Sequence, residues 1–121
     1  MNMKTNTRQT GEVTIVDISG RISLGQESAA LRDLVRDLLK NGQRKIVLNL
    51  ADVDYIDSSG LGTLVAAVST ARREGGDIKL VNLTDKVDDL MQVTRLYTVF
   101  EIADDEAGAI KSFGRTAAAG A

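Results

Sequence analysis

Residues 45–62 have the sequence KIVLNLADVDYIDSSGLG, and this stretch decides the fold. It opens with KIVLNL, a nearly continuous apolar run that is typical of a β-strand covered on both faces. Over residues 59–74 the apolar side chains recur at the three- and four-residue spacing of a helix, which Gly75 and Gly76 end. A covered strand followed closely by a helix predicts parallel strands joined by helical crossovers.

The segments on either side repeat this alternation. Upstream, an apolar stripe predicts a helix over about residues 25–40, with Ser23 and Gln26 as a capping box at its start. Downstream, the pattern predicts in order a strand, a helix capped by Thr84 or Asp85, a short strand and a closing helix. The two strands are residues 77–83 and 98–102, and the closing helix is residues 103–113. The helix between the two strands has an apolar face formed by Val87, Leu90, Met91 and Val93 or Thr94.

The N-terminus predicts a β-hairpin. A polar edge strand reaches Gln9, a turn follows over residues 10–12, and residues 13–18 are β-branched and apolar enough for a sheet interior. The expected fold class is therefore α/β, a single domain with a mixed β-sheet in which an N-terminal hairpin is followed by alternating helices and strands. Leu48 and Leu64 should lie in the core. The domain should span residues 1–113 and leave a flexible tail over 114–121, which has no apolar stripe to dock.

The composition excludes several function classes. The 121 residues are 43% hydrophobic and 26% charged, as in a folded domain, and they include no Cys and no His, which removes thiolate and imidazole chemistry. A net charge of -2 and few aromatic residues argue against direct binding of nucleic acid. The longest apolar run, residues 64–68, is too short for membrane insertion, and the N-terminus lacks a secretory signal. We predict a cytoplasmic protein.

The segment with the most functional information is DSSGLG, residues 57–62. Asp57 or Ser58 is expected to cap the following helix. A cap explains one polar residue but not two serines followed by two glycines. Glycine in a helix costs up to about 1 kcal/mol relative to alanine, so Gly60 and Gly62 indicate that something approaches the backbone closely. We interpret the segment as a contact surface.

A phosphate on either serine would suit this position. It would face the positive end of the helix dipole, so the fold should tolerate it. It would also add a charge of about -1.5 to -2 beside Asp54 and Asp57 and change the surface that a bound protein meets. Tolerated folding with altered binding is what a phosphorylation switch requires.

The DSSGLG segment after IVLNL, together with the order of elements over residues 13–113, resembles the STAS domain of bacterial anti-sigma-factor antagonists. The resemblance implies that an anti-sigma factor, itself a serine kinase, phosphorylates Ser59, with Ser58 as the runner-up. It implies that the unphosphorylated chain binds this anti-sigma factor and frees a sigma factor, and that a PP2C-type serine phosphatase resets the switch. The expected partner-binding residues are Ser23, Asp54, Asp57, Ser58, Ser59, Gly60, Leu61 and Gly62.

The chain departs from the family pattern after the hairpin. Many antagonists have Gly-Glu-Ile-Asp or Gly-Glu-Leu-Asp there, whereas this chain has Gly20, Arg21, Ile22 and Ser23. Ser23 is expected to cap the first helix. Arg21 in place of an acid changes the local charge, so the identity and type of the partner stay open.

Other functions have less support. We predict no enzyme, no cofactor and no metal site, because the acidic residues Asp52, Asp54 and Asp57 have the pattern of a solvated cluster. The glycines at 60 and 62 lack the third glycine of a dinucleotide fingerprint, and those at 75 and 76 are not followed by the Gly-Lys-Ser/Thr of a phosphate loop. The main alternative is a non-switching STAS scaffold subunit of a lipid transporter or a stress-signalling complex.

Overall fold

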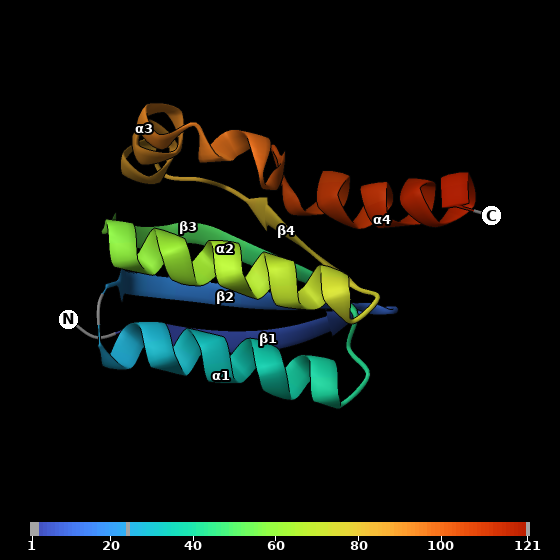
Figure 1. Ribbon diagram of the computed structural model, residues 1–121. Coiled ribbons are helices and arrows are strands. Elements are labelled where there is room, and N and C mark those ends of the chain that lie inside the picture. The colour runs from blue at the N-terminus through green and yellow to red at the C-terminus, as the bar shows by residue number, and fades with distance from the viewer. Residues whose placement is uncertain (1–2, 24, 121) are drawn as a thin grey trace.

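The computed structural model describes residues 3–23 and 25–120, with side chains up to Phe113. Its elements are β1 (Lys4–Thr10), β2 (Val13–Ile22), α1 (Gln26–Lys40), β3 (Lys45–Ile56), α2 (Ser58–Arg73), β4 (Asp77–Val81), α3 (Asp85–Thr94), a 3₁₀ turn (Leu96–Thr98), β5 (Glu101–Ala103) and α4 (Glu106–Gly120). The sheet has the order β1-β2-β3-β4-β5; β1 and β2 are antiparallel and the other pairs are parallel. The predicted mixed α/β sheet with an N-terminal hairpin is confirmed (Figure 1).

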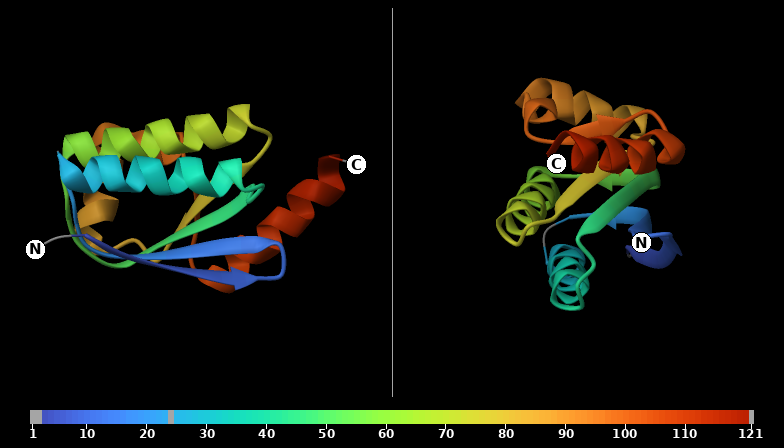
Figure 2. Two further views of the ribbon diagram at one scale, coloured as in Figure 1. Left: turned by 90° about the horizontal axis from the view of Figure 1, so that it is seen from below. Right: turned by 90° about the vertical axis from the view of Figure 1, so that its right-hand side faces the viewer.

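The central strand β3 is covered on both faces. Helices α1 and α2 lie side by side on one face of the sheet, and α4 lies on the opposite face (Figure 2). Ile46, Val47 and Leu48 are all fully buried, which explains why the run is continuous and not alternating. Leu48 and Leu64 belong to the core, as predicted.

A smaller apolar cluster holds α4 to the sheet. It consists of Val13, Ile15, Val47, Val81, Ala109 and Phe113. Lys79 of β4 lies on this side and is only 1% exposed, with its ammonium paired to Glu101 and 4.8 Å from the centre of the Phe113 ring. The carboxylate and the ring face both stabilise the charge, so a lysine is tolerated beneath the helix.

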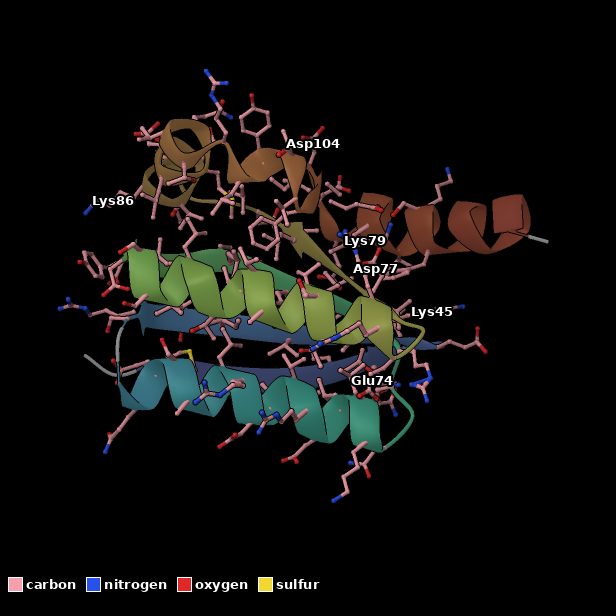
Figure 3. All side chains as sticks on the ribbon, in the orientation of Figure 1. Lys45, Glu74, Asp77, Lys79, Lys86 and Asp104 are labelled. Carbon is pink, nitrogen blue, oxygen red and sulfur yellow. The ribbon has the colours of Figure 1, made fainter. Side chains whose placement is uncertain are left out.

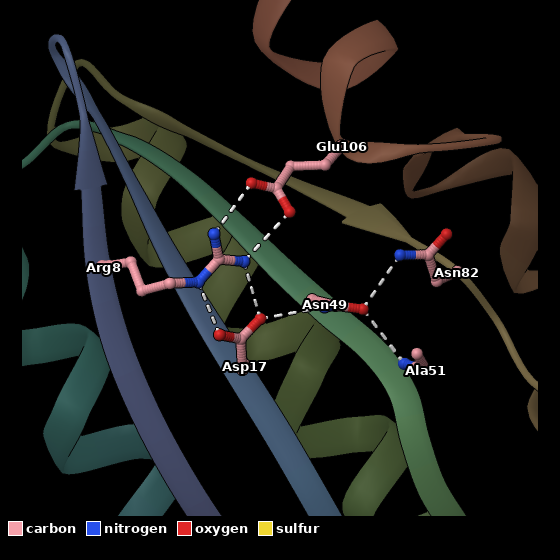
Figure 4. A network of polar contacts seen from close by, with 6 residues as sticks. All are labelled: Arg8, Asp17, Asn49, Ala51, Asn82 and Glu106. Carbon is pink, nitrogen blue, oxygen red and sulfur yellow. Dashed lines mark hydrogen bonds and ion pairs between the residues drawn. The ribbon is translucent and has the colours of Figure 1, made fainter.

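A polar network centred on Arg8 joins β1, β2, β3 and α4 (Figure 4). The guanidinium donates to both carboxylate oxygens of Asp17 on β2, at 2.6 and 2.9 Å, and to both of Glu106 on α4, at 3.0 and 2.9 Å. Asn49 of β3 also donates to Asp17, at 2.8 Å. The hydrogen bonds from Arg8, and after them the one from Asn49, hold the pKa of Asp17 below its usual value.

This network predicts a loss of stability in acid. Because the pKa of Asp17 is lower in the folded chain than in the unfolded chain, ionised Asp17 stabilises the fold. This stabilisation is complete above the unfolded pKa of about 3.9, and it disappears as the pH falls through the lower pKa of the folded chain. The free energy of unfolding of Asp17→Asn should therefore fall less steeply than that of the wild type below about pH 4. Urea unfolding across this pH range measures the difference. Asp33→Asn, at an exposed position of α1, is the matched control; equal slopes for both variants would contradict the assignment.

The ends of several elements differ from the prediction. Strand β3 continues to Ile56, and its pairing with β2 shifts register twice, which accommodates polar residues in a strand. The predicted strand over residues 98–102 is wrong in its bounds: Arg95 ends α3 at φ 61°, a 3₁₀ turn follows, and β5 begins at Glu101. The backbone of α4 is helical past the predicted end at Phe113. The flexibility of residues 114–121 stays a prediction, and residue 121 lies outside the described residues.

Candidate functional site

The turn from β3 into α2 forms the candidate site, and we call residues 57–62 the serine turn. Asp57 has an extended backbone and is the N-cap of α2. Its side chain accepts a hydrogen bond from the amide of Gly60 at 2.8 Å, and its carbonyl accepts one from Leu61 at 2.9 Å. Of the two predicted caps the structure therefore selects Asp57, and Ser58 becomes the first helical residue.

The two glycines of the serine turn differ in the space that surrounds their Cα atoms. A Cβ on Gly60 would lie 2.1 Å from the carbonyl oxygen of Ile22, because the start of α2 packs directly on the end of β2. The same carbonyl accepts a hydrogen bond from Asp57 at 3.4 Å. A Cβ on Gly62 would meet nothing within 4 Å. The close approach expected from the sequence is thus made at Gly60 by the chain itself.

The structure divides the predicted partner-binding residues by exposure. Gly60 and Leu61 are buried, so they can affect a partner only through the shape of the turn. Asp57 and Ser23 are half-buried. The exposed members are Asp54, Ser58, Ser59 and Gly62. These four present two hydroxyls, one carboxylate and bare backbone to a partner.

The two serines of the turn have different neighbours in the next turn of α2. Gly62 lies four residues after Ser58, on the same face of α2, and leaves the space beside that hydroxyl open. Thr63 lies four residues after Ser59, and its hydroxyl donates to the Ser59 carbonyl at 3.1 Å. Both serine side chains are exposed.

The capping role expected of Ser23 is wrong. The N-cap of α1 is Gly25, at φ 102°, and no side chain among the described residues caps this helix. Ser23 lies two residues before that cap, so its hydroxyl does not reach the first-turn amides. It donates instead to the carboxylate of Glu27 at 2.8 Å, while its carbonyl accepts a hydrogen bond from Ser28 at 2.6 Å. Ser23 therefore orders the entry to α1 through side-chain contacts.

Arg21 acquires a defined position beside the site. It is the cross-strand neighbour of Tyr55, and its guanidinium lies over the Tyr55 ring, 4.4 Å from the centroid. Such a contact orders both exposed side chains. The basic residue that departs from the family pattern is thus held against the strand that leads into the serine turn.

The sequence did not single out a groove that adjoins the serine turn. A cavity of about 380 Å³ lies between the end of β3 and helix α3, lined by Tyr55, Ile56, Lys86, Asp89, Leu90 and Val93. Figure 3 shows Lys86 at the end of the molecule where α2 begins. Val93, which the helical pattern offered as an inward-facing position, is 81% exposed. Hydrophobic periodicity alone could not separate this surface from the core face of α3.

Within residues 3–23 and 25–120, no group of three or more acidic side chains is arranged to hold a metal ion. No helix in the described part of the chain is both long and apolar enough to cross a membrane.

Comparison with known proteins extends these findings. The family model described as "STAS domain" matches residues 4–109. The anti-sigma-B factor antagonist of Bacillus subtilis (strain 168) is 29% identical over 111 residues, which cover 92% of this chain and all of the relative.

Solved structures share the fold. A candidate anti-sigma factor antagonist from Thermotoga maritima superposes with a TM-score of 0.82 at 27% identity, covering 89% of this chain and 92% of that one. The phosphorylated form of SpoIIAA, a cell fate determinant of Bacillus, has a TM-score of 0.66 at 16% identity over 93% of this chain and 99% of its own. At this identity the likeness shows the fold alone. Because the family model covers nearly the whole sheet and its helices, the chain belongs to the STAS domain family.

Proposed function

We propose that this chain is an anti-sigma-factor antagonist whose binding to an anti-sigma factor is controlled by phosphorylation of the serine turn. The observation that carries the proposal is the exposure of both Ser58 and Ser59 in the first turn of α2, directly after the Asp57 cap. The names of the relatives support the role, since this chain matches the anti-sigma-B factor antagonist of Bacillus subtilis over that protein's full length.

The local electrostatics explain how a phosphate could act as a switch. The first turn of α2 has no acidic side chain, so a phosphate there would gain from the helix dipole without a like charge inside the turn. Asp54 and Asp57, just outside it, would together with the phosphate make the surface strongly acidic. A partner matched to the uncharged hydroxyls would then meet repulsion and an added desolvation cost. The fold persists and the docking surface changes.

The proposed pathway has three partners. An anti-sigma factor that is also a serine kinase binds the unphosphorylated chain and thereby frees its sigma factor. The same kinase phosphorylates the serine turn and ends the interaction, and a PP2C-type serine phosphatase restores the hydroxyl. In this scheme the chain is a substrate and a ligand, and it works in the cytoplasm, where sigma factors act.

Phosphopeptide mapping identifies the acceptor. After incubation with the kinase and ATP, we expect label at Ser59, with Ser58 as the runner-up. Ser58→Ala and Ser59→Ala serve as controls for each other, since only the acceptor variant should lose the label. Labelling of Thr63 with the serine pair unlabelled would contradict the proposal.

A pull-down from the native cytoplasm tests the class of partner. Mass spectrometry should identify an ATPase related to histidine kinases with serine specificity, recovered by the unphosphorylated chain. Recovery of a transporter ATPase whose binding is the same with and without a phosphate on the serine turn would favour the non-switching scaffold.

A further inference from the structure

We propose that the groove between the end of β3 and helix α3 receives an amphipathic helix of the anti-sigma factor, and that this contact supplies affinity while the serine turn supplies control. The inference rests on the proposed function and names a second part of the same docking surface. We call the six lining residues, Tyr55, Ile56, Lys86, Asp89, Leu90 and Val93, the α3 groove.

The α3 groove brings exposed apolar side chains next to the edge of the core. Four large hydrophobic side chains are exposed among the described residues, and two of them, Tyr55 and Val93, line this groove at 40% and 81% exposure. Leu90, one turn of α3 before Val93, is partly buried and forms part of its wall. Contiguous exposed apolar surface of this kind marks an interaction site more often than isolated residues do.

The α3 groove is continuous with the serine turn. Tyr55 and Ile56 line the groove and directly precede the Asp57 cap. A stable protein interface buries about 800 Å² on each partner, which the serine turn alone is too small to provide. A protein that covers the exposed serines with enough area to bind firmly therefore extends over neighbouring surface, and the α3 groove is one apolar part of that surface.

The two charged residues of the groove complement an amphipathic helix. Lys86 and Asp89 lie one turn apart on α3 and place one positive and one negative charge among the apolar side chains. An amphipathic helix that inserts an apolar side chain between Tyr55 and Val93 can set an acidic residue against Lys86 and a basic one against Asp89. Opposite charges on the rim fix the direction of the bound helix.

The test compares two variants of α3 that carry the same new charge. Val93→Glu places a carboxylate in the groove, whereas Gln92→Glu places it at the adjacent exposed position, which does not line the groove. Both positions are exposed, so both variants should have the same melting temperature as the wild type. Calorimetry with the purified anti-sigma factor recovered by the wild-type chain should show at least about tenfold weaker binding for Val93→Glu. Binding of Gln92→Glu should stay within about twofold of the wild type.

Each other outcome overturns the inference. If Val93→Glu binds as the wild type while an aspartate in the serine turn still weakens binding, the groove is not part of the interface and the proposed function stands. If the wild-type chain binds no anti-sigma factor, both proposals fail. If the wild-type chain self-associates in sedimentation experiments and Val93→Glu alone abolishes the association, the occupant is a second copy of this chain.

Discussion

Replacing Gly60 by alanine is expected to lower the free energy of unfolding by about 3 kcal/mol, whereas Gly62→Ala should raise it by up to about 1 kcal/mol. The added Cβ at Gly60 would lie 2.1 Å from the carbonyl oxygen of Ile22, a contact with backbone that no rotamer change relieves. The start of α2 must then move away from β2. At Gly62 the same methyl group meets open space, and alanine gains its ordinary helix preference.

Urea unfolding of the two variants measures this contrast. Because both residues lie in the first turns of α2, differences in helix propensity cancel and the sign of the effect reports the contact with Ile22. Equal stabilisation by both substitutions would show that α2 does not pack on the end of β2 as described. The Gly60 variant should also lose docking, since the serine turn shifts with the helix.

Aspartate in the serine turn is expected to weaken binding of the anti-sigma factor at least about tenfold, a loss of roughly 1.4 kcal/mol. Ser58→Asp and Ser59→Asp each add a carboxylate near Asp54 and Asp57. A partner whose surface is matched to uncharged hydroxyls must then desolvate this carboxylate, and its own groups are repelled by the added charge. Both should melt near the wild type, because the helix dipole favours the added charge. Ser58→Ala and Ser59→Ala keep small neutral side chains and should bind nearly as the wild type does.

Calorimetry with all four variants measures these affinities. Tighter binding by either aspartate variant would reverse the sign of the proposed switch. Equal binding by all four would favour a constitutive scaffold. The aspartate variant with the larger loss of affinity, at position 58 or 59, indicates which hydroxyl lies nearer the partner.

Much of the fold was predictable because its strongest signals are local. The run over residues 45–50 predicted a doubly covered strand, and Ile46, Val47 and Leu48 are indeed buried on both faces of the sheet. The hairpin and α2 followed from turn residues and periodicity. The last strand was misplaced because the left-handed Arg95 and the 3₁₀ turn after it depend on packing that propensity does not encode.

The start of α2 at the serine turn was predictable from the sequence, whereas the contacts of the individual residues were less so. A capping-box spacing suggested Ser23, but the entry to α1 is set by Gly25 at a positive φ, so the serine hydroxyl meets Glu27 instead. The two costly glycines suggested that a partner approaches the backbone of the serine turn, but the close approach at Gly60 is made by Ile22 of the chain itself. Only the three-dimensional contact with Ile22 separates Gly60, required for packing, from Gly62, which leaves the helix face open.

The most direct test of the account is the affinity of the anti-sigma factor for the chain before and after phosphorylation of the serine turn. The chain is treated with the kinase, the modified serine is confirmed by mapping, and both forms are titrated calorimetrically against the purified anti-sigma factor in a nucleotide state that prevents further phosphorylation. We expect the unmodified chain to bind and the phosphorylated chain to bind at least about tenfold more weakly, with both forms folded. Equal or tighter binding by the phosphorylated chain would contradict it.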